Sequence, residues 1–286
     1  MKKKRIRIVF LTIGLLAMLL AAGCGRRSKE SLENELAYRQ LGINKMNEGD
    51  YEGAVEMFQN ALDQSLAVIE DLEIDICYYK AVAQYKGGDV EGAFATYNAL
   101  IEYDKKNADA LYLRGTLYLQ EGDSENALKD YEDALEQDTR NIALYNKIAE
   151  NLNGAGLTED AGEILNQALA VEERDAADYR EKGYTYYLLG QYDSARTYLD
   201  RAIDQEDTEA VFYLAKVSEA QGDTEAANQL YETYVESHSD DTETLNALGL
   251  ARLSEGSYDQ ALTFFQKALE QESPVNEQEL RRNEII

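Results

Sequence analysis

The 286-residue sequence has only one histidine and two cysteines, residue types that often support catalysis, metal binding or disulfide cross-links. Its single histidine, His238, cannot supply a metal motif that needs two histidines. No Gly-x-Ser-x-Gly segment occurs, and no Walker lysine follows a run of glycines. Because every reactive motif that can be tested is missing, we predict that the protein is not an enzyme, has no small-molecule substrate, and uses neither a metal nor a dissociable cofactor.

Proline and basic residues are scarce as well. Pro274 is the only proline, and helix-forming residues run through the chain, which predicts an all-α protein. Asp and Glu total 55 against 28 Lys and Arg, a net charge of −27. This charge disfavours nucleic acid as a partner and favours a basic protein or peptide. The acidic runs lack the alternating ligands and central glycine of a calcium loop, so we interpret them as solvated surface.

Against this background, glycine recurs with a period close to 34 residues. Each of these glycines has a small residue seven positions before it and an alanine five positions after it, which predicts a helix–turn–helix solenoid. The first repeat is expected as a helix over 36–48, a turn at Gly49-Asp50 and a helix over 51–64, with the aspartate capping the second helix. The seven glycines are Gly49, Gly88, Gly122, Gly156, Gly190, Gly222 and Gly256.

A stripe of apolar residues follows the alanines. A large apolar residue lies four positions after each alanine, and a further apolar residue comes three positions later. This spacing puts the stripe on one helix face and predicts a core rather than a cofactor site. The large members are Phe58, Tyr97, Tyr131, Leu165, Leu199, Tyr231 and Phe265.

These residues resemble the tetratricopeptide repeat family, most closely over Ala110–Asp138 and Asp178–Asp204. The fourth repeat departs from the family at its turn, and the proline that usually closes each repeat survives only as Pro274. The resemblance covers 35–275. It implies an all-α, right-handed superhelical solenoid of about seven helix pairs, whose first helices line a concave groove. Residues 276–286 are expected to form a short capping helix, with a partner-binding tail as the alternative.

The resemblance also implies which side chains face the groove. Tyrosine offers a large contact area at low entropic cost, which suits peptide binding, although packing between repeats is the alternative role for these rings. Asn146, Lys147, Glu150 and Asn153 of the fourth repeat are expected as a polar interruption. The basic residues on this face do not form the clamp with which some family members hold a carboxylate tail. The expected groove residues are Tyr79, Tyr85, Tyr112, Tyr184, Tyr187, Phe212 and Tyr213.

The N-terminus differs from the rest of the chain. A basic start precedes the apolar run Ile8–Ala22, which is short for a membrane span and suits a signal peptide. The sequence Leu20-Ala21-Ala22-Gly23-Cys24 resembles a bacterial lipobox, so we expect cleavage after residue 23 and diacylglycerol on Cys24. Residues 24–34 are then a lipidated N-terminus and short tether, with helix beginning near Ser31. An uncleaved signal anchor is the alternative.

Together these patterns predict a lipoprotein held by its lipid anchor on the outer side of a cell membrane. Its function is expected to be binding a protein or peptide partner in the tyrosine-rich groove, in envelope assembly, secretion or wall synthesis. The alternative is a structural subunit of an envelope complex that uses its convex face or its ends. With Cys24 lipidated, Cys77 has no disulfide partner. We interpret it as a small buried hydrophobe rather than a redox-sensitive thiol.

Overall fold

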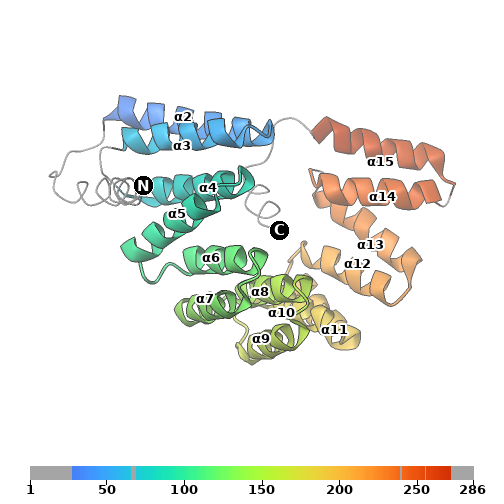
Figure 1. Cartoon of the computed structure of the whole chain (residues 1–286). Coiled ribbons are helices and arrows are strands. Elements are labelled where there is room, and N and C mark those ends of the chain that lie inside the picture. The colour runs from blue at the N-terminus through green and yellow to red at the C-terminus, as the bar shows by residue number, and fades with distance from the viewer. Residues whose placement is uncertain (1–27, 66–68, 239, 255, 272–286) are drawn as a thin grey trace. The chain divides into compact units, whose positions relative to one another are not determined.

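The computed structural model describes residues 28–65, 69–238, 240–254 and 256–271 (Figure 1). The signal peptide, Cys24 and the expected capping helix at 276–286 lie outside these ranges. Within them the chain forms fourteen helices and no strand. The helices are α2 (Lys29–Asn47), α3 (Tyr51–Gln64), α4 (Asp71–Lys86), α5 (Val90–Tyr103), α6 (Ala108–Gln120), α7 (Ser124–Gln137), α8 (Ile142–Gly154), α9 (Thr158–Ala170), α10 (Ala176–Leu188), α11 (Tyr192–Ile203), α12 (Ala210–Ala220), α13 (Thr224–Ser237), α14 (Thr242–Ser254) and α15 (Tyr258–Gln271). None of the helices in the described ranges is long and apolar enough to cross a bilayer.

The described helices fall into two compact units, which divide between Tyr118 and Leu119, and within each unit consecutive helices pack as antiparallel pairs. In the first unit α2 packs on α3 and α4 on α5, and α3 also contacts α4. In the second unit the pairs are α8–α9, α10–α11, α12–α13 and α14–α15. The first helices of successive pairs touch directly, α8 with α10 and α10 with α12. Each pair therefore buries its apolar face against its neighbours, which is the packing of an all-α solenoid.

The seven turn glycines all adopt positive φ, between 69° and 84°. A Cβ in this left-handed conformation meets a steric penalty that glycine avoids. In four repeats the aspartate after the glycine accepts a hydrogen bond from the amide three residues on, as Asp50 does from Gly53 and Asp89 from Gly92. Both the turn positions and the caps predicted from the sequence are confirmed.

The small residues mark the closest crossings of paired helices. A Cβ added to Gly42 would lie 2.5 Å from Phe58 Cε1, and one added to Gly249 would lie 2.5 Å from Phe265 Cε1. The alanines of the pattern are at most 2% exposed, and Phe58 and Tyr131 are fully buried. The apolar stripe is therefore the core, as predicted. Its large residues are less buried in the C-terminal repeats, where Tyr231 and Phe265 are half-buried.

A second periodic set of caps was missed in the sequence. A side-chain oxygen at the start of five first helices accepts a hydrogen bond from the amide three residues on, over 2.9 to 3.1 Å. These residues are spaced 34, 34, 32 and 34 apart, like the glycines, and the common spacing was the available signal. They are Asn107, Asn141, Asp175, Asp207 and Asp241.

The first helix begins earlier than expected. Lys29 is the first residue of α2, and the Ser28 side chain caps it by accepting from the Ser31 amide. The helix expected near Ser31 therefore starts two residues earlier, so residues 29 and 30 belong to it and not to the tether. Any tether that follows Cys24 is correspondingly shorter.

One residue departs from the turn rule. Among the described residues Glu206 is the only non-glycine with positive φ, 68°. It follows α11, where the sequence lacks two residues of the period, and the Glu206 and Asp207 amides close the helix end on the Ile203 and Ala202 carbonyls. The shortened connection replaces the usual loop with a tight turn that needs a left-handed residue.

We expect Glu206→Gly to stabilise the protein. Removing the Cβ relieves the left-handed strain, partly offset by the greater freedom of glycine in the unfolded chain, for a net gain of about 0.5–1 kcal/mol. Urea denaturation followed by circular dichroism measures the change. Gln205→Gly, at a neighbouring residue with negative φ, should give no gain. An equal response of the two variants would show that strain at Glu206 is not the cause.

Candidate partner-binding surface

Six aromatic side chains gather on helices α10, α12 and α13 of the second unit. Tyr184 stacks on Tyr187 with ring centroids 5.7 Å apart, and its ring also lies 4.7 Å from that of Tyr213. Phe212 meets Tyr213 edge to face at 5.6 Å. We call this set the aromatic surface; it comprises Tyr184, Tyr187, Phe212, Tyr213, Tyr231 and Tyr234.

The members of the aromatic surface differ in exposure. Tyr184 is 8% exposed, and its hydroxyl donates to Glu150 Oε1 on α8. Tyr187 and Tyr213 pack partly against the core between α11 and α12 but stay half-buried, as do the other three rings. Tyr184 therefore serves mainly as packing between repeats, whereas the half-buried rings retain area that a ligand can contact.

Carboxylates contact the hydroxyl groups of two of these rings. Glu219 Oε2 accepts from the Tyr231 hydroxyl at 3.1 Å. Burial, reinforced by the nearby Glu150, raises the pKa of Tyr184. Burial and Glu219 likewise raise the pKa of Tyr231. The phenols therefore remain neutral hydrogen-bond donors throughout the physiological pH range.

The remaining predicted groove residues belong to the first unit. Tyr79 is 4% exposed, stacks on Phe58 at 5.8 Å and lies under the Arg39 guanidinium, so it is a core residue rather than an exposed one. Tyr85 on α4 and Tyr112 on α6 are half-buried. The preceding residue, Tyr78, is half-buried. The sequence could not decide between the two tyrosines, because which of them faces the core depends on how α4 is rotated against its neighbours.

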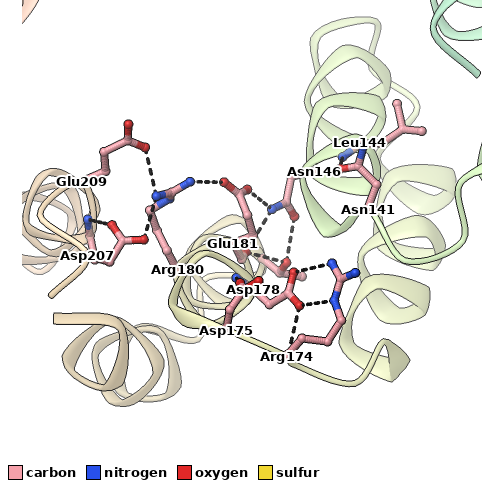
Figure 2. A network of polar contacts seen from close by, with 12 residues as sticks. Asn141, Leu144, Asn146, Arg174, Asp175, Asp178, Arg180, Glu181, Asp207 and Glu209 are labelled. Carbon is pink, nitrogen blue, oxygen red and sulfur yellow. Dashed lines mark hydrogen bonds and ion pairs between the residues drawn. The ribbon is translucent and has the colours of Figure 1, made fainter. Parts of the chain in front are cut away.

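One residue of the expected polar interruption is not where we predicted it, whereas Lys147, Glu150 and Asn153 are exposed. Asn146 is 1% exposed, and its side chain joins α8 to α10 by donating to the Glu181 carbonyl at 2.9 Å and accepting from the Thr185 hydroxyl at 2.8 Å. Figure 2 shows Asn146 directed at Glu181. A buried amide must satisfy its hydrogen bonds inside the protein, and here the next repeat supplies the partners. Asn146 is thus an internal connection and not part of the surface.

Arg180 is held in the same network. Its guanidinium lies 2.7 Å from Asp207 Oδ2, 3.0 Å from Glu209 Oε2 and 3.4 Å from Glu181 Oε1 (Figure 2). Burial raises the pKa of Glu181 despite the neighbouring arginine. Because carboxylates already surround Arg180, this side chain joins consecutive repeats rather than offering a free cation to a partner.

A polar pocket lies beside this network, with a volume of about 340 Å³. Its charged lining is balanced, with three arginines and three carboxylates, and Arg174 pairs with Asp178 at 2.8 Å. No group of three or more His, Cys, Asp or Glu side chains within the described ranges is arranged to hold a metal ion. The pocket therefore offers no charge preference that would select a ligand. Its charged residues are Asp138, Arg140, Arg174, Asp178, Arg180 and Glu181.

Cys77 lies on α4 as a free thiol, and burial raises its pKa to about 11. Since the thiolate is the nucleophile, we expect slow alkylation by iodoacetamide at pH 7–8 and a rate that rises as the pH approaches 11. Measuring the rate against pH in a Cys24→Ser chain, where Cys77 is the sole thiol, tests this. In urea, where the chain is unfolded, the pH at which the alkylation rate is half-maximal should fall to about 8.5, the pKa of an exposed cysteine. The same midpoint in both states would contradict it.

Comparison with protein families covers most of the chain. A tetratricopeptide repeat model matches residues 39–102, 78–142 and 214–277, and a second tetratricopeptide repeat model matches 179–209. The chain belongs to the tetratricopeptide repeat family. Repeats of this kind stack into arrays with extended binding surfaces, so the fold is that of a scaffold for protein–protein interaction.

Two of the similar solved structures, with TM-scores of 0.50 or more, show the same tetratricopeptide repeat fold. Yeast Tom70 is 18% identical with a TM-score of 0.62, over 93% of this chain and 55% of that one. A tetratricopeptide repeat protein from Parabacteroides merdae is 18% identical with a TM-score of 0.50, over 87% and 97% of the two chains. MamA is 26% identical with a TM-score of 0.39, over 55% and 94%. A search of curated proteins found no match.

Proposed function

We propose that this protein is a membrane-tethered lipoprotein scaffold that binds a protein or peptide partner on its aromatic surface. One observation carries the proposal: the first helices of two consecutive repeats, α10 and α12, together present half-buried rings. Tyr187, Phe212 and Tyr213 offer contact area beside neutral hydroxyl groups. Rigid aromatic side chains of this kind dominate many protein interfaces.

The tether follows from the N-terminal sequence and from the start of α2. If Cys24 carries diacylglycerol, residues 24–28 separate the lipid from the first helix at Lys29. Five extended residues reach at most about 17 Å, so the repeats are held close to the membrane surface. Tethering raises the local concentration of the scaffold for a partner in the same envelope. In envelope assembly, secretion and wall synthesis, a tethered scaffold of this kind would bring its partner proteins together at the membrane.

Adjacent residues on α10 provide a test of the binding surface. Tyr186 packs on Tyr198, with ring centroids 5.1 Å apart, whereas Tyr187 belongs to the aromatic surface. A photo-cross-linking amino acid is placed at position 186 or 187 of the full-length protein in its native host. We expect a cross-linked partner from position 187 and none from position 186.

Other outcomes of the cross-linking assign contact elsewhere. Equal capture from positions 186 and 187 would show that the contact is not confined to the aromatic surface. Capture from position 186 alone would favour the rival hypothesis, in which the protein is a structural subunit that uses another face. Capture from neither position would contradict binding at α10. Identifying the captured protein by mass spectrometry indicates in which process the scaffold acts.

A further inference from the structure

The second unit contains another aromatic cluster whose rings are covered by the protein's own cations. Tyr198 of α11 lies 6.2 Å from Tyr179 and 5.1 Å from Tyr186, centroid to centroid. Arg201 Cζ lies 5.9 Å from the Tyr179 centroid and 5.8 Å from that of Tyr198, and Lys182 Nζ lies 5.9 Å from Tyr198. A cation over a ring face is attracted by the negative charge density of the π system. This cluster therefore already has its cations.

On the aromatic surface, carboxylates lie at the hydroxyl groups of two rings, Tyr184 and Tyr231. In the parts of the chain that are described, no lysine or arginine lies over the rings of Tyr184 or Tyr187, and Lys216 lies over Phe212 at 5.1 Å. Glu150 accepts from the Tyr184 hydroxyl, and Glu219, an exposed residue, accepts from that of Tyr231. Burial raises the pKa of Tyr187, and the neighbouring Tyr192, Glu219 and Glu150 shift it in the same direction.

The charge of the surrounding repeats has the same sign. Residues 119–271 contain 34 acidic and 11 basic residues. Several of the basic ones are already paired: Arg180 with Asp207, Arg174 with Asp178, and Arg252 with Glu232. The field around the aromatic surface is therefore negative, which attracts a positively charged ligand and repels an acidic one.

We propose that the partner segment bound by the aromatic surface is basic, and that it places an arginine or lysine over Tyr187 beside Glu150 and Glu219. The inference rests on the proposed function and specifies the chemistry of its partner. A ring face and a carboxylate act on the same cation: the ring attracts it electrostatically, and the carboxylate neutralises it. The half-buried rings of Phe212 and Tyr213 then contact the apolar part of the side chain or its neighbours.

The test uses detergent-solubilised full-length protein and three fluorescein-labelled peptides at about 150 mM salt, where exposed charges further apart than about 8 Å are largely screened. The probes are twelve-residue peptides that alternate glycine with arginine, citrulline or glutamate. Citrulline has nearly the shape of arginine without its charge. By fluorescence anisotropy we expect the arginine peptide to bind at least about tenfold more tightly than the citrulline peptide, and the glutamate peptide not to bind.

Matched variants separate this site from general attraction to an acidic protein. Tyr187→Ala and Glu219→Gln should each lower the affinity for the arginine peptide about threefold to tenfold. Tyr198→Ala, in the second cluster, and Glu163→Gln, an exposed residue of α9, should leave its affinity unchanged. Circular dichroism confirms that each variant is folded.

Each contrary result has a defined meaning. The basic-ligand proposal is overturned if Tyr187→Ala and Tyr198→Ala lower the affinity for the arginine peptide equally. It is also overturned if the arginine and citrulline peptides bind equally well. If no peptide binds while position 187 still cross-links a partner, the scaffold function holds and the inference about charge fails. If position 187 also captures nothing, both fail.

Discussion

The Cys24→Ser variant is expected to leave the membrane fraction of its host almost completely, whereas the unmodified protein remains there. Serine has no thiol to accept diacylglycerol, and the described part of the chain contains no helix able to span a bilayer. Each buried methylene of a lipid chain contributes about 0.8 kcal/mol, so losing two acyl chains removes stable anchoring. Fractionation of cells followed by immunoblotting measures the distribution.

The other cysteine provides the matched control. Cys77 lies on α4 among the repeats, so Cys77→Ser should leave the protein in the membrane fraction. If Cys24→Ser also stays there at the level of the unmodified protein, the apolar run Ile8–Ala22 acts as an uncleaved anchor. Mass spectrometry of the N-terminus then distinguishes a lipidated Cys24 from an intact signal segment.

Gly183→Val is expected to lower the free energy of unfolding by about 1–3 kcal/mol. A Cβ at this position in α10 would lie 2.7 Å from Leu199 Cγ and 3.3 Å from the Ala195 carbonyl oxygen of α11. Leu199 is fully buried, so it has no space into which to move. Valine therefore forces the two helices apart and disturbs the core that supports Tyr187 and Tyr213.

A second helical glycine provides the control for this prediction. A Cβ at Gly162 in α9 has no atom within 4 Å, so Gly162→Ala is expected to stabilise the protein by about 0.5–1 kcal/mol through helix propensity alone. Urea denaturation of both variants, followed by circular dichroism, measures the difference. Two destabilising changes of similar size would mean that close helix crossing is not what requires glycine at position 183.

The predictions that held depend on local backbone geometry. A turn glycine and the aspartate that follows it act within a few residues of chain, so their positions suffice to predict the left-handed turn and the helix cap. The prediction that the apolar stripe is buried was confirmed for a similar reason, because helical spacing alone puts Phe58 and Ala61 on one face. The start of α2 at Lys29 lies two residues before the expected start near Ser31, because Ser28 caps the helix ahead of the repeat pattern.

The predictions of the candidate site succeeded less evenly because they depend on neighbouring repeats. Tyr79 was expected at the groove but is buried on Phe58, and Asn146 was expected on the surface but bonds to Glu181 and Thr185. Arg180 forms an ion pair with Asp207 of the next repeat. Such partners lie in the neighbouring repeat, 21 to 39 residues away in sequence, and their pairing depends on how each helix is rotated against the next.

The sequence alone determined the family, the all-α class, the repeat boundaries and the residues of the turns, because the period of 34 and the needs of the left-handed turn are visible in one chain. Only the tertiary structure decided which aromatic rings meet. It gathered Tyr184, Tyr187 and Tyr213 from α10 and α12 beside Glu150, and it covered Tyr198 with Lys182 and Arg201. The reason is that side-chain environment depends on the packing of consecutive helix pairs, which no single repeat specifies.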